Sequence, residues 1–327
     1  MPGLVDRVDA YQRRHRWLAI PIGVVYKFFD DQGSYIAAVL TYYAFVAIFP
    51  ILLIASSVLG FVLQGHPSLQ EDILSSALAQ FPIVGDQLGR PEGIRGSTTA
   101  VVVGSLTALY GVVGLGQAAQ NAVNVTSAIP RNSRLNPVVS RLRSLVWLVL
   151  AGVSLLLIAA LPSLGSYLEV FGAELGGAER WLTNAATVVL NTVVLGVMMR
   201  LSTPHNEGLL EVVRGAAAIA VLWQLLQVLG GVYVERVIKD ASEMNAVFAV
   251  VLGLIALLYI GNVIAVLGLE INVVLAKRLY PRALLTPFTD SVELTEADRK
   301  VYREYAEAQR HKGFERVRVR FEDPPDS

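Results

Sequence analysis

Amide side chains lie inside stretches of the sequence that are otherwise apolar. Four fall within about two helical turns, and a second group recurs at spacings of three and four, which places it on one face of a helix. Such amides can bond to a neighbouring helix, or they can line a polar cavity that contacts a headgroup or a solute; both interpretations stay open. With one hydroxyl among them, they are Gln117, Gln120, Asn121, Asn124, Asn184, Thr187, Asn191, Gln224 and Gln227.

Glu270 is the acidic residue closest to apolar sequence, about two helical turns before Lys277. A carboxylate there can bind a proton or a cation. Alternatively, it can pair with a basic residue of the segment 131–143 and fasten the helix ends together. The candidate polar residues of this stretch are Tyr259, Asn262, Glu270 and Asn272.

The residue types that most enzymes and metal sites use are scarce. The chain has no cysteine, and its four histidines, His15, His66, His205 and His311, lie outside the long apolar stretches. No cluster of carboxylates or histidines stands ready to hold a metal ion and activate water. The formal net charge is zero, so no basic field favours nucleic acid. We therefore expect no enzyme activity, cofactor, metal or nucleic-acid partner.

Composition indicates what must position these side chains. Hydrophobic residues make up 54% of the chain and charged residues 17%, which is typical of a membrane protein. A membrane-spanning helix needs about 20 apolar residues. Six stretches fit, near residues 36–63, 98–125, 144–168, 181–199, 215–234 and 245–275. The prediction is an all-α, polytopic bundle of six transmembrane helices.

Basic residues predict the orientation of the bundle. Five precede the first span, and Arg131, Arg134, Arg141 and Arg143 lie between the second and third. Since Lys and Arg concentrate in cytoplasmic connections, both termini are expected in the cytoplasm. Three regions follow: a cytoplasmic amphipathic segment 1–31, a transmembrane domain 32–282 and a cytoplasmic tail 283–327.

Segments outside the spans carry signals of their own. An apolar stripe from Leu4 to Phe29 predicts a helix that is bent near Pro21. The helix lies either in the membrane interface or packed on the cytoplasmic face of the bundle, because both need the same amphipathic pattern. Residues 67–81 predict an amphipathic helix in an external loop. A capping-box-like pattern from Thr295 to Asp298 predicts a short helix in the tail. The alternating residues 316–321 suit an edge strand, a contact with anionic lipid or a solvated, partly disordered end.

Two prolines fall inside predicted spans. Pro50 removes a backbone donor and clashes with the carbonyl group of Val46, and Pro162 does the same to Ile158. We expect both helices to kink. A kink is either a packing feature or a gating hinge, and the sequence leaves both open.

Three segments together resemble the YihY/BrkB family. They are residues 37–50, residues 117–131, and Leu258-Tyr259 followed by residues 268–272. The resemblance covers about 28–282 and implies a six-helix, multi-pass protein of the bacterial cytoplasmic (inner) membrane that is connected with envelope integrity. Val125, Ser127 and Leu257 depart from it, because family members often have Arg or Trp there. An older ribonuclease label of the family does not suit a chain that lacks a metal-ligand cluster.

The leading hypothesis is a protein that moves or organises a lipid or another amphiphile in the bilayer. It rests on intramembrane amides without a charged ion path. One alternative is a structural or scaffolding component without a transported substrate, which forms a homo-oligomer or binds a cytoplasmic partner. Another is a small-solute or ion-coupled transporter built on Glu270.

Overall fold

All regular structure in the described residues is helical. The computed structural model describes residues 4–62, 98–136, 138–146, 149, 153, 178–202, 209–233, 243–284, 286 and 292–322. The segment 138–146 is helical as well. The other elements are α1 (Leu4–Arg14), α2 (Arg16–Asp30), α3 (Gly33–Val62), α6 (Thr98–Thr126), the short 3-10 helix η2 (Arg131–Ser133), α8 (Ala178–Ser202), α9 (Leu209–Tyr233), α10 (Glu243–Lys277) and α11 (Glu296–Ala308).

Five of the six predicted spans coincide with the helices α3, α6, α8, α9 and α10. Most of the third span, 144–168, and the predicted loop helix 67–81 lie outside the described residues. Among the described residues, Val212–Val232 of α9 and Phe248–Lys277 of α10 are long and apolar enough to cross a membrane. The apolar stretches Gly33–Ile48 of α3 and Asn184–Arg200 of α8 are shorter. The number of crossings therefore stays a prediction.

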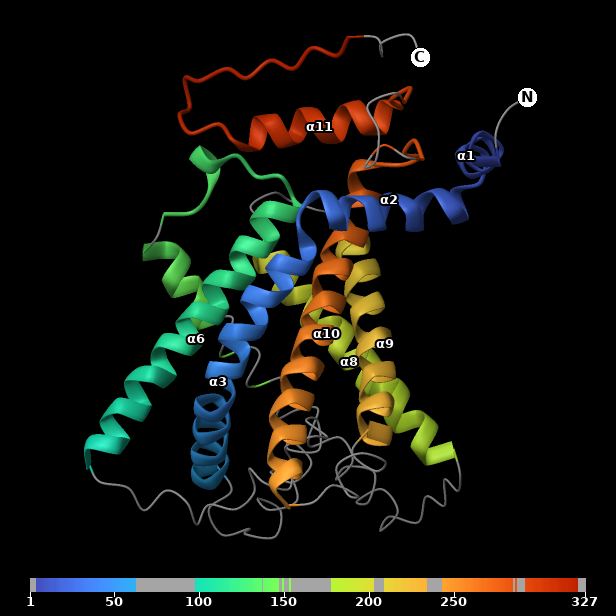
Figure 1. Cartoon of the computed structure of the whole chain (residues 1–327). Coiled ribbons are helices and arrows are strands. Elements are labelled where there is room, and N and C mark those ends of the chain that lie inside the picture. The colour runs from blue at the N-terminus through green and yellow to red at the C-terminus, as the bar shows by residue number, and fades with distance from the viewer. Residues whose placement is uncertain are drawn as a thin grey trace.

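The long helices form a bundle in which α10 is central. It contacts α2, α3, α6 and α9, while α8 packs on α9 and α3 packs on α6. Figure 1 shows α2 lying across one end of the bundle, with α11 beyond it. Both termini lie at this same end, which is the upper end as drawn and is called the upper end below.

Close approach of α9 and α10 depends on glycine. A Cβ atom on Gly215 would lie 2.2 Å from the carbonyl oxygen of Gly268, and one on Gly268 would lie 2.1 Å from Cγ1 of Ile219. Neither distance is sterically possible. Small residues at such positions let two backbones approach, which brings the polar groups of both helices within bonding distance.

The N-terminal segment is helical and interrupted at one residue, and a bend of α2 near Pro21 stays a prediction. The helix is interrupted at His15, whose backbone is extended, and α2 continues through Pro21. One side of α2 packs on the bundle through buried Gly23, Val24 and Phe28. The other side exposes Trp17 and Phe29, each 65% accessible, together with Val25.

The tail helix α11 begins as the sequence predicts and is docked on the bundle. Thr295 and Asp298 form a capping box. Val301 is 1% exposed and packs with Val24 of α2 and Val274 of α10. Residues 315–322 form no strand among the described residues, so the edge-strand alternative for 316–321 is wrong.

Candidate functional site

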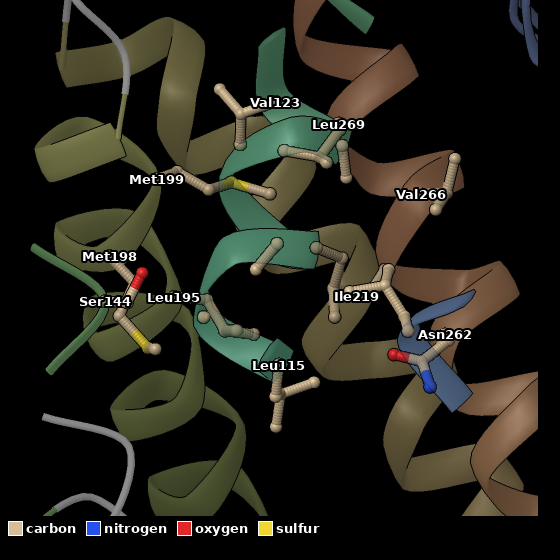
Figure 2. Close-up of a pocket in the computed structure, with 15 residues that line it drawn as sticks. Leu115, Val123, Ser144, Leu195, Met198, Met199, Ile219, Asn262, Val266 and Leu269 are labelled. Atoms are coloured by element: carbon tan, nitrogen blue, oxygen red, sulfur yellow. The ribbon is translucent and has the colours of Figure 1, made fainter. Parts of the chain in front are cut away.

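An apolar cavity of about 230 Å³ lies inside the bundle. Its lining comes from α3, α6, α8, α9 and α10, together with Ser144. Figure 2 shows aliphatic and thioether side chains of several helices around this one space, with Asn262 at its side. An engineered apolar cavity of about 150 Å³ already accepts benzene and stays free of water. The cavity is therefore large enough for part of a hydrocarbon chain.

Small residues on one face of α6 leave space for the cavity. On α6, Gly116, Ala119 and Ala122 line it at a spacing of three, so short side chains stand where larger ones would fill the space. On α8, Met198 and Met199 form part of the wall. Methionine is flexible and polarisable, and it adapts to ligands of irregular shape.

The polar side chains at the edge of the cavity already have partners. Nδ2 of Asn262 donates to Oγ1 of Thr41 at 3.2 Å and to the carbonyl oxygen of Leu258 at 2.9 Å. Oγ of Ser144 donates to the carbonyl oxygen of Ser140 and accepts from Nε2 of Gln120, both at 2.9 Å. The space thus suits an apolar group better than a polar one.

The four amides of α6 differ in their surroundings. Gln120 is buried and binds the segment 138–146, because its Nε2 donates to the carbonyl oxygen of Ser140 at 2.8 Å and its Oε1 accepts from the hydroxyl of the same serine. Gln117 and Asn121 are exposed, and Asn124 is half-buried. None of the four lines the described cavity.

The polar residues of α8 and α9 also lie away from the cavity lining. Asn184 is exposed, whereas Thr187, Asn191, Gln224 and Gln227 are half-buried. Tyr259 of α10 is 36% exposed and does not line the cavity either. Whether these side chains contact a ligand stays a prediction. The same holds for the kinks, since α3 passes through Pro50 without a break in its helix and Pro162 lies outside the described residues.

Asn272 joins α10 to the start of α9. Its Oδ1 accepts from the backbone N–H of Gly215 at 2.7 Å, and its Nδ2 lies 3.4 Å from the carbonyl oxygen of Val212. The side chain is 5% exposed. The contact depends on the close approach of the two helices at Gly215.

Glu270 belongs to a buried ionic cluster at the upper end. Its partner is Lys27 of α2, with Nζ 3.4 Å from Oε2, and not a basic residue of 131–143. Nζ of Lys27 also donates to Oδ2 of Asp31 at 2.5 Å and lies 5.4 Å from the ring centre of Tyr305. Burial opposes the charge of Lys27, but Glu270 and Asp31 outweigh it and raise its pKa. Burial also raises the pKa of Tyr305.

A second buried cluster surrounds Arg282, just after α10. The guanidinium pairs with Asp298 of α11 and, at 3.1 Å, with Asp30 of α2. Oδ2 of Asp298 also accepts from the backbone N–H groups of Ala283 and Thr295, each at 3.0 Å. Burial opposes the charge of Arg282, yet Asp298 and Asp30 raise its pKa. Asp298 of the capping box is therefore also the counterion that holds α11 on α2 and on the end of α10.

Sequence reasoning found Glu270 but missed Lys27, Asp31 and Arg282. The spacing of Lys27 and Asp31, four residues apart on a predicted helix, is a signal for that ion pair. Arg282 gives no comparable signal, because its partners are distant in sequence. In the part of the chain that the structure describes, no group of three or more metal-ligating side chains is found.

The chain is similar to known membrane proteins. The sequence profile of a family described as virulence factor BrkB matches residues 24–290. The inner membrane protein YhjD of Escherichia coli (strain K12) is 25% identical over 257 residues, which cover 71% of this chain and 74% of that protein. No solved structure matches the chain significantly.

Proposed function

Because the chain belongs to the BrkB family, we propose that it is a six-span protein of the bacterial inner membrane that binds and moves, or organises, a lipid or another amphiphile for the integrity of the envelope. YhjD is named an inner membrane protein, which supports the location. The cavity is the observation that carries the proposal. It lies among the predicted spans, and its lining suits a hydrocarbon chain.

The arrangement of the helices supports six crossings. Both termini lie at the upper end, where α2 exposes an apolar stripe with Trp17 at one end. Tryptophan is enriched at membrane interfaces, and an amphipathic helix there lies in the plane of the bilayer. The upper end also carries the arginines that the positive-inside rule assigns to the cytoplasm.

Filling the cavity tests the proposal. Ala265 of α10 lines the cavity, whereas Ala256 on the same helix is exposed. In vesicles that contain a phospholipid with a photoreactive acyl chain, we expect crosslinks to Met198 or Met199. Ala265→Leu should reduce them strongly, because the added side chain occupies the cavity. Ala256→Leu should leave them unchanged. Equal labelling of the original protein and both variants would remove the basis of the proposal. The absence of any crosslink to a cavity residue would do the same.

A structural role is the second candidate. Its support is that Gln120, Asn262 and Asn272 each bond to a neighbouring segment of the bundle, as packing contacts do. This candidate predicts that Ala265→Leu leaves envelope resistance intact wherever the protein still folds. The lipid-binding proposal predicts a loss.

A further inference from the structure

A groove of about 560 Å³ at the upper end is lined by five arginines from three parts of the chain. Arg13, Arg14 and Arg16 surround the junction of α1 and α2, Arg214 lies near the start of α9, and Arg278 directly follows α10. No acidic residue belongs to the lining. Five guanidinium groups around one space repel one another unless an anion joins them.

Four of these arginines have no ion pair with a described acidic side chain. Arg13 pairs with Asp9 at 2.6 Å, but Arg14, Arg16, Arg214 and Arg278 pair with none. The nearby Lys27 and Arg282 clusters differ, since each cation there has two carboxylate partners. Guanidinium groups match the geometry of a phosphate, with two parallel hydrogen bonds per arginine.

The backbone places Arg278 in the groove at a conformational cost. Its φ angle is 54°, in the left-handed region, and the N–H of Leu279 bonds to the carbonyl oxygen of Val274 at 3.0 Å. This helix ending favours glycine, because a Cβ atom strains it. The chain nevertheless has an arginine at this position, beside four others.

The position of the groove indicates a lipid as the source of the anion. Leu275 and Ala276, which form part of its lining, belong to the last turn of the apolar span Phe248–Lys277. Trp17, beside Arg16, is exposed on α2. The groove therefore begins where the apolar surface ends, at the depth of the headgroups. We propose that it binds the phosphate of an anionic phospholipid headgroup. The inference does not depend on the cavity.

Lipid binding by the purified full-length protein tests this. Native mass spectrometry measures the binding of phosphatidylglycerol, of phosphatidylcholine with the same acyl chains, and of inorganic phosphate. Comparison of the two lipids tests the preference for a negative headgroup, and comparison with inorganic phosphate tests whether the anion must belong to a lipid. We expect preference for phosphatidylglycerol, and Arg214→Gln with Arg278→Gly should weaken its binding roughly tenfold per arginine. The control is Arg303→Gln with Arg318→Gln, an equal charge change at exposed positions outside the groove, and it should retain wild-type binding.

The single variant Arg278→Gly controls for misfolding. Arg278→Gly removes the strain at a left-handed position, so the Tm of this single variant should not fall while its lipid binding does. Ala265→Leu should leave phosphatidylglycerol binding unchanged, which separates this inference from the proposed function. Retained preference in the double variant, equal binding of phosphatidylcholine, or inorganic phosphate bound as tightly as the lipid would overturn the assignment.

Discussion

At the scale of single residues, Lys27 supplies the positive charge that two buried carboxylates share. Its side chain is 1% exposed, and its Nζ reaches both Asp31 and Glu270. Lys27→Met would leave two uncompensated carboxyl groups in the interior, so we expect a loss of about 3–5 kcal/mol in the free energy of unfolding. Thermal or chemical unfolding of the purified protein measures it.

Glu270→Gln is the matched comparison. It keeps an oxygen near Lys27 and leaves the pair of Lys27 and Asp31 intact, so its effect should stay below about 1 kcal/mol. Equal losses for the two variants would mean that ionised Glu270, and not the lysine, holds the cluster together. Loss of a transport activity in a stable Glu270→Gln protein would revive the ion-coupled alternative.

Asp30 gives the upper end a dependence on pH. Burial raises the pKa of its carboxyl group above the ordinary 3.8, and Arg282 offsets only part of this. The folded chain then binds the proton more tightly than the unfolded chain. The stability that Asp30 contributes is thus present below its unfolded pKa and is lost as the pH rises through its folded pKa.

Asp30→Asn removes this titration and keeps an oxygen that can accept from Nη2 of Arg282. The variant should therefore gain in Tm relative to the original chain as the pH rises from about 4 to about 7, with the two nearly equal at the acidic end. Tm values over this range are the measurement. A difference that shrinks with rising pH would show that the Arg282 pair, and not burial, dominates.

At the scale of elements, the fit of α9 against α10 depends on Gly215. A Cβ atom there would meet the carbonyl oxygen of Gly268 and lie 2.4 Å from Oδ1 of Asn272. Gly215→Ala should cost about 1–3 kcal/mol, because the helices must separate. A Cβ atom on Gly231 of the same helix would have no neighbouring atom within 4 Å, so Gly231→Ala should be neutral or stabilise by up to about 1 kcal/mol. Unfolding of both variants in one detergent compares them; similar losses would show that helix propensity decides.

The helices themselves were predictable, because a long run of apolar residues indicates a helix that is surrounded by lipid or by other helices. The bounds of α6 and α10 agree with the predicted spans to within two residues at each end. The residues that α2 contacts on the bundle were not predictable. Asp30 contacts Arg282, 252 residues away, and no periodicity records such a contact. Gln120, Asn262 and Asn272 bond to neighbouring segments of the bundle. The sequence could not show this, because whether an amide points to a neighbour or to a cavity depends on the packing of several helices.

The docking of α11 also changes how the tail can be tested. Deleting the residues after Thr286 removes Asp298, the counterion of a side chain that is 0% exposed, and leaves Arg282 with Asp30 alone. Such a deletion weakens the bundle as well as removing a tail, so loss of function after it does not demonstrate a tail partner. Substitutions on the exposed face of α11, such as at Arg303, avoid this.

At the scale of the whole molecule, both termini at one end imply an even number of crossings between them. Five long helices are described, namely α3, α6, α8, α9 and α10. If each of the five crosses the membrane, we predict a sixth crossing, and the apolar stretch 144–168 has the length and composition for it. The connections 64–97 and 169–180 should then face the outside, and the segment 126–143 and the tail should face the cytoplasm.

The chain has no cysteine, so single-cysteine variants test this prediction without background labelling. In intact spheroplasts, a maleimide that cannot cross the membrane should label Ser68→Cys and Ala173→Cys, while Ser133→Cys and Gly313→Cys should react only after permeabilisation. Labelling of Ala173→Cys on the same side as Ser133→Cys would show that 144–168 does not cross. The even count would then fail, because the two ends of the bundle would no longer lie on the sides that the basic residues predict.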